Sequence, residues 1–410
     1  MPVPPDLAAV ARPRRASACR EDTPTRCEVA VVDRGASGGQ GGDVMDLDAE
    51  FRRLVSFGPD VVHPDGGAAW LDDDGEPLLD RPVLVYSTAR MAHVHALAAM
   101  AGIASSEPLA DALLAALAGP LRDAEHGGWR ASSVSDAKAA YDHAFVLLAA
   151  STATVAGHPA GPALLRDALT AHERFWEPDA GMVCDLFDGT WARRDDYRGL
   201  NANMHTVEAL LAAADATDDP RWRERALRIA ATGVERWGRA FGWRLPEHFT
   251  PAWEPMPEHH RDRPDDPFQP YGATIGHGLE WSRLLLHLEA ALGPGAPAWL
   301  RPAAAALYDR AVTDGWAADG ADGFVYTTDW SGQPVVHDRM WWVAAEGAAA
   351  AAALHAVAGD PRHAAHADRF WAFIEEFHVD RERGSWVHQL DRHNRHSPTV
   401  WPGKPDLYHA

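Results

Sequence analysis

The chain has 410 residues, of which 46% are hydrophobic, and a formal net charge of −21. A protein this acidic repels phosphate groups, so neither nucleic acid nor an anionic membrane is expected as a partner. The sequence contains no run of about 18 apolar residues, so no membrane span is predicted. Three cysteines offer no disulfide framework, and the N-terminus lacks the apolar stretch of a secretory signal, so we expect a cytoplasmic protein.

Residues 1–44 differ in composition from everything after them. They are rich in Arg, Pro, Gly and Ser, show no hydrophobic period, and carry six Arg against six Asp and Glu. This composition is typical of a disordered extension, and Met45 offers an alternative start. A functional basic arm is the other interpretation, which the zero net charge disfavours. We expect residues 45–410 to form a single catalytic domain.

From Met45 onward, apolar residues recur with the period of amphipathic helices. Pro and Gly bound many of these segments, for example at 157–159 and 218–220. Most neighbouring helices are therefore expected to pair as antiparallel hairpins. Eleven helices are predicted, at 46–57, 87–102, 106–119, 136–156, 161–176, 201–216, 219–239, 274–292, 297–315, 339–358 and 361–378.

A glycine-containing motif follows the outer helix of each hairpin and opens a short stretch that alternates like a strand. It reads GGW at 127–129, GMV at 181–183, FGW at 241–243, GFV at 323–325 and GSW at 384–386. A hairpin repeated roughly every 60 residues indicates stacked units that share one core. We predict an all-α (α/α)6 barrel with short β-hairpins at one mouth and the insertion 240–272 over that mouth. Eleven helices leave the sixth pair incomplete, so we expect either that the last helix, which should begin at 406–410, is absent from this sequence or that the ring closes imperfectly.

Two inner helices each carry a histidine and a glutamate three residues apart. His205 precedes Glu208, and His277 precedes Glu280. Residues at i and i+3 share one face of a helix, so each pair points into the same space. A neutral imidazole suits proton transfer near neutral pH, and a carboxylate can orient the ring. Because inner helices of such a barrel point the same ends at one mouth, these groups are predicted to converge.

Other polar groups begin the remaining inner helices. These are Arg90, the stretch YDH at 141–143, and the pair Trp341 and Trp342 followed by Glu346. For Arg90 two interpretations stay open: an ion pair with a buried carboxylate, or a hydrogen-bond fork for substrate oxygens. Histidines outside this pattern are read as packed or solvated helix residues.

The sequence contains no motif for a metal or a nucleotide. HExxH and CxxC are absent, and the glycine-rich run at 35–42 has no strand and helix around it to complete a phosphate site. His259 and His260, in the 240–272 insertion, could collect a divalent ion, although loop histidines are usually solvated. We therefore expect no metal and no cofactor.

Six segments together resemble the N-acylglucosamine 2-epimerase superfamily, in particular its mannose isomerase and sulfoquinovose isomerase branch. They are WLDDDG at 70–75, TARM at 88–91, YDHAF at 141–145, NANMH at 201–205, GHGLEW at 276–281 and GKPDLYH at 403–409. The resemblance spans about residues 50–410, and it implies the (α/α)6 barrel and metal-free proton transfer on a sugar. It also implies that His277 and His409 form the acid/base pair. Sugar contacts are implied for Arg90, His205, Glu280 and one of Trp341 and Trp342, with Gln389 at the cavity floor or wall.

The resulting hypothesis is an aldose–ketose isomerase acting on a monosaccharide, D-mannose to D-fructose, through a cis-enediol. The alternatives are an N-acylglucosamine or other sugar 2-epimerase, a sulfoquinovose isomerase, a glycoside hydrolase on the same barrel, and a non-catalytic sugar-binding protein. A sulfonated sugar would require an added cation, for which Arg244, Arg261 and Arg263 are the candidates. A homo-oligomer is compatible with the sequence, which does not determine the oligomeric state.

Overall fold

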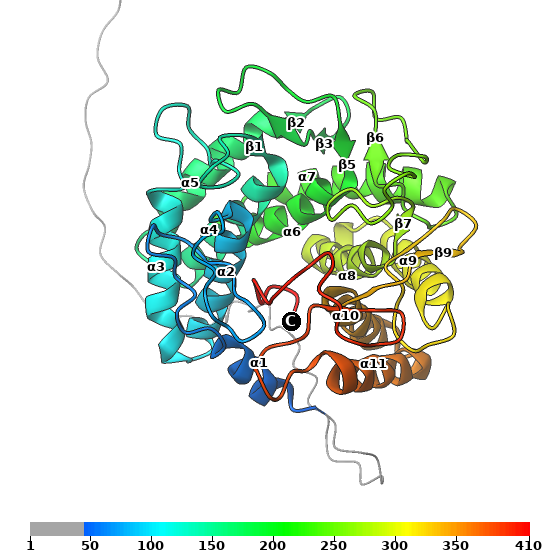
Figure 1. The fold of residues 1–410 in the computed structure, drawn as a ribbon. Helices are drawn as coiled ribbons and strands as arrows, with labels where there is room; N and C mark the ends of the chain where they lie inside the picture. The colour runs from blue at the N-terminus through cyan, green and yellow to red at the C-terminus, as the bar shows by residue number, and fades with distance from the viewer. Residues whose placement is uncertain (1–44) are drawn as a thin grey trace, which may run out of the picture. The chain divides into compact units, whose positions relative to one another are not determined.

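The computed structural model describes residues 45–410, so the expectation of a disordered segment at 1–44 lies outside the described residues. All eleven predicted helices are present in this part of the chain (Figure 1). They are α1 Leu47–Val55, α2 Val85–Met100, α3 Glu107–Ala118, α4 Ala140–Val155, α5 Gly161–His172, α6 Leu200–Thr217, α7 Arg221–Ala230, α8 Ile275–Leu292, α9 Leu300–Gly315, α10 Trp341–Ala358 and α11 Pro361–Phe373. The ends of α7 and α11 continue as π-helices, η3 Ala231–Gly238 and η5 Ile374–His378.

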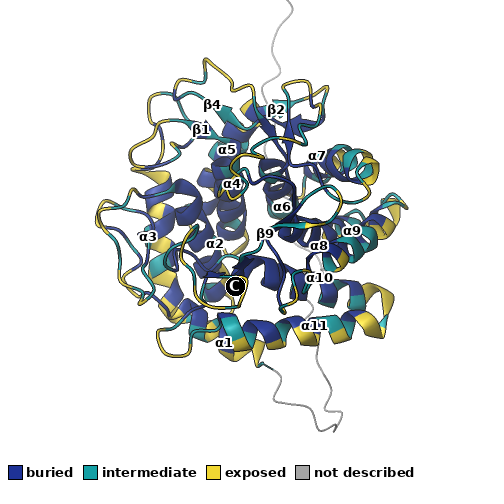
Figure 2. Ribbon diagram, turned by 45° about the vertical axis from the view of Figure 1, so that its right-hand side comes forward, coloured by how far each residue is buried: buried dark blue, intermediate teal, exposed yellow. Residues whose placement is uncertain are grey.

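The helices form an inner and an outer ring, as expected for an (α/α)6 barrel. Helices α2, α4, α6, α8 and α10 each pack on the next, and α3, α5, α7, α9 and α11 each cover their hairpin partner from outside. Figure 2 shows the inner helices mostly buried and the outer ones exposed along one side. One hydrophobic core runs through all of these helices. The predicted fold class is therefore confirmed.

Local sequence explains where individual helices stop and start. At the end of α10, Gly359 adopts φ 68°, a left-handed conformation that glycine reaches without steric cost. Asp360 then caps α11 by accepting from the Arg362 N–H, and Pro361 occupies the first turn, where no N–H donor is needed. These three consecutive residues thus end the inner helix α10 and start its outer partner α11.

Short antiparallel strand pairs lie at the N-terminal ends of the inner helices. Strand β1 (Lys138–Ala139) leads into α4, β5 (Arg198–Gly199) into α6, β7 (Ala273–Thr274) into α8 and β10 (Arg339–Met340) into α10. Their partners are, in the same order, β4 (Leu186–Phe187), β6 (His248–Phe249), β8 (Thr327–Thr328) and β11 (Gln389–Leu390). A third strand, β9 (Pro334–Val336), pairs with β8. One further pair consists of β2 (Trp176–Glu177) and β3 (Met182–Val183). The first four pairs fix the first turns of α4, α6, α8 and α10 at one mouth of the barrel, and an isolated bridge between Leu84 and Ser132 precedes α2.

The predicted strand-like stretches after the glycine motifs are found at four of five positions. Residues 182–183 form β3, and Trp129, Phe324 and Trp386 make isolated antiparallel bridges. At 241–243 the prediction is wrong, because the chain makes a turn in which the Trp243 N–H donates to the Gly238 carbonyl. The strand of this unit, β6, starts only at His248.

The segment 401–410 enters the centre of the barrel, where the C-terminus lies in Figure 1. Its residues form turns and no helix, with the Ala410 N–H donating to the Leu407 carbonyl. Lys404 anchors it, because its backbone N–H donates to the Leu71 carbonyl and its buried Nζ donates to Asp380 Oδ2 and the Gly384 carbonyl at 2.7 Å each. The described segment therefore reaches the barrel interior through specific contacts.

Among the helices of residues 45–410, none combines the length and the apolar character that crossing a membrane requires.

Candidate active site

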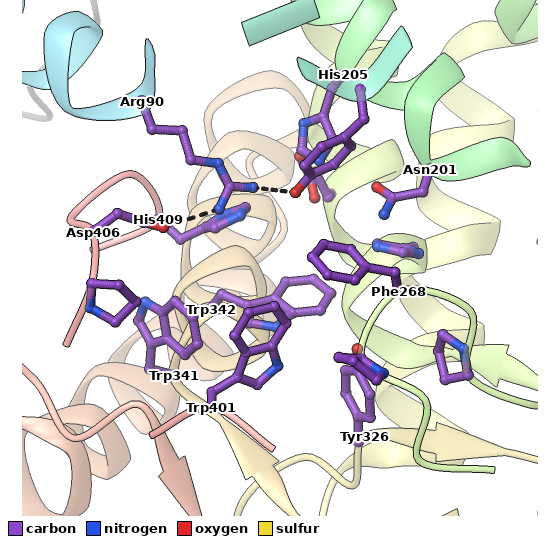
Figure 3. A pocket seen from close by; sticks show the side chains of 16 residues that line it. Arg90, Asn201, His205, Phe268, Tyr326, Trp341, Trp342, Trp401, Asp406 and His409 are labelled. Atoms are coloured by element: carbon purple, nitrogen blue, oxygen red, sulfur yellow. Dashed lines mark hydrogen bonds and ion pairs between the residues drawn. The ribbon is translucent and has the colours of Figure 1, made fainter. Parts of the chain in front are cut away.

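A cavity opens at the mouth where the inner helices begin (Figure 3). It encloses about 590 Å³ of space, including the part open to solvent. Seven of the eight predicted site residues line it, and only Gln389 does not. The lining residues are Arg90, Tyr141, Asn201, His205, Pro267, Phe268, Pro270, His277, Glu280, Tyr326, Trp341, Trp342, Trp401, Pro405, Asp406 and His409.

His277 lies in the first turn of α8 and is paired with a glutamate from a distant loop. Its Nδ1 donates to the carboxylate of Glu247, 2.9 Å from each oxygen, and both side chains are nearly buried. This partner differs from the expected one, Glu280 on the same helix face. Glu247 directly precedes β6, and its carbonyl accepts from the Leu200 N–H at the start of α6. With Nδ1 engaged, Nε2 is the nitrogen left for the cavity.

His409 makes the same kind of contact on the other side. Its Nδ1 lies 3.1 Å from Oε1 of Glu346, a residue of α10. Glu346 is shared, because Arg283 of α8 also donates to both of its oxygens, at 2.9 and 3.0 Å. Burial opposes ionisation of Glu346, but Arg283 and His409 outweigh it and lower its pKa to about 2. Burial also lowers the pKa of His409, against the opposing effect of Glu346, so the ring is neutral near pH 7.

Trp342 lies between the two histidines. Its ring centroid is 5.3 Å from that of His277 and 5.5 Å from that of His409, with an interplanar angle of 37° to each. Gly276 makes this position possible, since a Cβ there would lie 2.2 Å from the indole ring. Two imidazoles thus face one cavity across a shared aromatic surface.

The structure shows the first of the two interpretations of Arg90, an ion pair with a buried carboxylate, while its contact with substrate oxygens stays a prediction. Its Nη1 donates to Asp406 Oδ2 at 3.2 Å, and its Nη2 donates to the Tyr141 hydroxyl at 2.6 Å, yet it also lines the cavity. Burial by itself would raise the pKa of Asp406, but Arg90, with smaller effects of two histidines, lowers it below the ordinary value. Arg90 therefore presents a fixed cation to the cavity and holds the segment 401–410 in place.

His205 and Glu280 form the floor between the two histidine–glutamate pairs. Nδ1 of His205 is 3.6 Å from Oε1 of Glu280 and 3.9 Å from Oε2 of Glu208, which in turn accepts from the Tyr408 hydroxyl. Burial lowers the pKa of His205 to about 3, although Glu208 opposes this, so the imidazole stays neutral. Burial, reinforced by the neighbouring Glu346, raises the pKa of Glu280 well above its ordinary value.

The loop 257–270 covers part of the mouth, as the insertion was expected to do. Pro267, Phe268 and Pro270 line the cavity, and Nε2 of His248 lies 2.8 Å from the Pro270 carbonyl oxygen. His260 Nδ1 lies 2.8 Å from the Gln269 carbonyl, and His259 stacks on His260 with centroids 3.8 Å apart. His259 and His260 thus have partners within the loop.

Gln389 is buried but supports a neighbouring segment from behind the cavity. Its Oε1 accepts from the N–H groups of Val400 and Trp401, and its Nε2 donates to Thr399 Oγ1 at 2.8 Å. Trp401 is itself a lining residue. Direct contact between Gln389 and a sugar stays a prediction, whereas its contact with the segment that carries Trp401 is a feature of the structure.

Among the described residues, two overlapping groups of side chains have ligand atoms close enough to hold a metal ion. They are His205 with Glu208 and Glu280, and Glu280 with Glu346 and His409. Arg283 already neutralises Glu346 at this place. Metal-free chemistry stays a prediction, and the experiments below include a chelator for this reason.

Sequence reasoning missed several lining residues and one important partner. Glu247 had no recognisable signal, because it lies in a loop 30 positions before the histidine that it contacts. Asp406 stood within the quoted motif GKPDLYH but received no role. Asn201, Tyr326, Phe268 and Trp401 come from helix starts and loops whose placement depends on the assembled barrel.

The barrel, the paired histidines and the surrounding polar groups define an isomerase of the N-acylglucosamine 2-epimerase class, and the chain belongs to this family. The family described as N-acylglucosamine 2-epimerase (GlcNAc 2-epimerase) matches residues 66–410.

Within the family, similarity points to one branch. The chain is 49% identical over 373 residues to a D-mannose isomerase of Thermobifida fusca, which covers 89% of this chain and 91% of that protein. It is 44% identical over 372 residues to a D-mannose isomerase of Pseudomonas cannabina pv. alisalensis, covering 89% and 90%. A crystal structure of D-mannose isomerase matches with a TM-score of 0.82 at 27% identity, over 88% of this chain and 94% of that one. The cellobiose 2-epimerase of Spirochaeta thermophila DSM 6192, 20% identical with a TM-score of 0.76 over 88% and 92%, has the same fold. The predicted mannose isomerase branch is confirmed.

Proposed function

We propose that the protein interconverts D-mannose and D-fructose without a metal ion. The observation that carries this proposal is the pair of histidines, His277 and His409, each bonded through Nδ1 to a buried glutamate and both facing one cavity across Trp342. Relatives at 49% and 44% identity bear the name D-mannose isomerase, which supports the choice of sugar.

The reaction begins with an open-chain sugar in the cavity. One histidine, through its free Nε2, removes the C2 proton of the aldose, and the electron pair forms the C1–C2 double bond of a cis-enediol. The same histidine or its partner then delivers a proton to C1. The glutamate at Nδ1 stabilises the imidazolium that exists between the two steps, as a carboxylate does in a catalytic triad.

Arg90 and His205 supply hydrogen-bond donors for the sugar oxygens, which become more negative as the C2 proton leaves. Both are held rigidly, Arg90 by Asp406 and Tyr141 and His205 by its burial in the floor. Donors fixed in advance stabilise developing charge without reorganisation during the reaction. Trp341, Trp342 and Trp401 offer flat apolar surfaces to the carbon side of the sugar.

The charged residues that line the cavity argue against a sulfoquinovose isomerase and against a glycoside hydrolase. Arg90 is the sole Lys or Arg among the described lining residues, and Asp406 already pairs with it. Arg244 bonds to Asp314 and Arg261 to Glu258, and neither these two nor Arg263 lines the cavity, where a sulfonate would need an added cation. A hydrolase needs two carboxyl groups on either side of one bond. The lining offers Glu280 and Asp406, of which the second is bound to Arg90.

The test is incubation of the protein with mannose, fructose and N-acetylglucosamine in deuterated water, with and without a chelator. We expect mannose and fructose to interconvert, with deuterium at C2 of mannose and C1 of fructose, and no effect of the chelator. An aldose inverted at C2 with no ketose would establish a 2-epimerase instead. Binding without deuterium incorporation would establish a sugar-binding protein, and loss of turnover with chelator would refute the metal-free mechanism.

A further inference from the structure

Glu280 is the one carboxyl group of the cavity floor whose oxygens have no partner. It lies one turn after His277 on α8, is 0% exposed, and lines the cavity, yet neither of its oxygens accepts a hydrogen bond from the described residues. A buried polar group without a partner is costly, so such a group in a native structure calls for an explanation. A bound substrate is the natural partner for a side chain that faces a binding cavity.

The neighbours of Glu280 determine its protonation. Glu346 is bonded to Arg283 and His409, and Glu208 is bonded to Tyr408, so both neighbours keep a negative charge in a hydrogen-bonded setting. Glu280 has no cation in hydrogen-bonding contact. Burial and the charge of Glu346, with a smaller effect of Glu208, raise its pKa well above the ordinary value against the opposing effects of Arg283 and Arg90, which favours the protonated form. A neutral carboxyl group carries one O–H donor and one C=O acceptor on adjacent atoms.

The proposed isomerisation has a requirement that the two histidines do not meet. They move the carbon-bound proton from C2 to C1, but a second proton must leave O2 and another must arrive at O1. His205 is nearest to Glu280, but burial keeps it neutral, so it orients oxygens rather than carrying an additional proton. The group that exchanges the oxygen-bound protons has to reach two adjacent oxygens and hold a proton between steps.

On the basis of the proposed function, we propose that Glu280 transfers the proton between O1 and O2. As the base removes the C2 proton, the C1=O1 π electrons move to O1, and one oxygen of Glu280 gives its proton to O1. The enediol then gives its O2 proton to the Glu280 carboxylate, the C2=O2 bond forms, and the imidazolium protonates C1. Glu280 ends protonated and the histidine neutral, so all protons balance and the cycle can repeat.

The decisive experiment separates carbon exchange from oxygen transfer. Glu280→Gln keeps the shape and neutrality of the side chain but cannot release and regain a proton. With mannose in deuterated water, we expect this variant to lose fructose formation at least 100-fold, while deuterium still enters C2 of mannose at a rate reduced only about 10-fold, in line with ordinary acid/base contributions. The ratio of exchange to isomerisation should therefore rise about 10-fold. Glu280→Asp, which retains a carboxyl group, should restore part of the original ratio.

Glu208→Gln is the matched control, because it removes a carboxylate from the same cluster without touching the cavity lining. We expect it to slow exchange and isomerisation in equal proportion. An unchanged ratio in Glu280→Gln, or isomerisation within threefold of the wild type, would overturn the proton-transfer role. Chelator-sensitive activity of the wild type would also overturn it, by making Glu280 a metal ligand.

Failure of the proposed function gives a different result. A wild-type protein that exchanges C2 and inverts it without forming ketose retains the histidine chemistry but has no use for transfer between O1 and O2. A wild type without any exchange would refute both proposals together. The wild-type products therefore test the function, and the ratio in the variants tests Glu280.

Discussion

His277 and His409 face the same cavity, and each bonds through Nδ1 to a glutamate, but one belongs to a helix and the other to a turn. His277 is fixed by the first turn of α8 and by Glu247, the residue directly before β6. His409 depends on contacts from far along the chain: Arg90 to Asp406, Tyr408 to Glu208, and Lys404 to Asp380. Equal geometry can thus rest on secondary structure on one side and on buried polar contacts on the other. Substitution of the residues that hold each histidine should therefore have different effects on the two sides.

The largest effect is expected from the histidines, and it should be similar on both sides. His277→Asn and His409→Asn should each lower kcat about 100-fold or more, because general acid/base groups contribute roughly 10² to 10⁴. Mannose–fructose turnover measures this, with mannose binding by calorimetry as the control for an intact cavity. Turnover above a tenth of the wild-type value in His277→Asn would remove it from the proton transfer.

Glu247→Gln should separate catalysis from stability on the helical side. The amide keeps a hydrogen bond to His277 but no longer stabilises the imidazolium, so we expect kcat to fall about 10- to 100-fold. Because α8 still holds the ring and the amide oxygen still accepts from Nδ1, the melting temperature should change little. A large fall in melting temperature with little loss of turnover would show that Glu247 contributes to stability rather than to catalysis.

Asp406→Asn should lower both the stability and the catalytic efficiency, because Asp406 lies on the His409 side of the cavity. It leaves the buried Arg90 without its anion, and breaking a buried ion pair lowers the free energy of unfolding by about 3 kcal/mol. We also expect about a 10-fold loss of kcat/KM, because His409 loses its anchor. Since the folded-state pKa of Asp406 is lowered, its stabilising effect is present above the unfolded-state pKa and is lost as the pH falls through the lower folded value. Urea unfolding of both proteins should therefore differ at pH 7 and converge in acid. A constant difference across pH would contradict the assignment.

The smallest effect is expected from Gln389, which acts through Trp401. Gln389→Ala removes the bonds to Val400 and Trp401 and should raise KM about fivefold with little change in kcat, the scale of one neutral hydrogen bond at about 1 kcal/mol. Steady-state kinetics with mannose tests this, and Gln389→Glu, which retains the acceptor, is the matched variant. A loss in kcat alone would assign Gln389 a direct role in the reaction.

The helices and the cavity were predictable because their signals are local. Apolar periodicity and glycine–proline boundaries located every α-helix of residues 45–410, and inner-helix starts identified His205, His277 and Glu280. His409 followed from the family motif alone, since local pattern gives no sign that a turn reaches the barrel centre. Glu247 could not be found this way, because pairing across 30 residues depends on where β6 places a loop residue.

The same limit applies to individual strands. The glycine motif at 241–243 matches its counterparts in letters, but the Trp243 N–H returns to Gly238 and ends the π-helix η3 in a turn. Hydrogen-bond partners of loops are set by tertiary packing rather than by the motif itself.

The contact between Arg90 and Asp406 also has a meaning for the order of folding. It joins positions 316 residues apart, the first inner helix and the final segment. Contacts of such separation form late, because a long loop must close before they contribute. During synthesis from the N-terminus, α2 to α10 can assemble while the cavity still lacks Asp406 and His409. The barrel is therefore expected to exist as a folded but inactive intermediate, and turnover should appear only after residues 406–409 have been made.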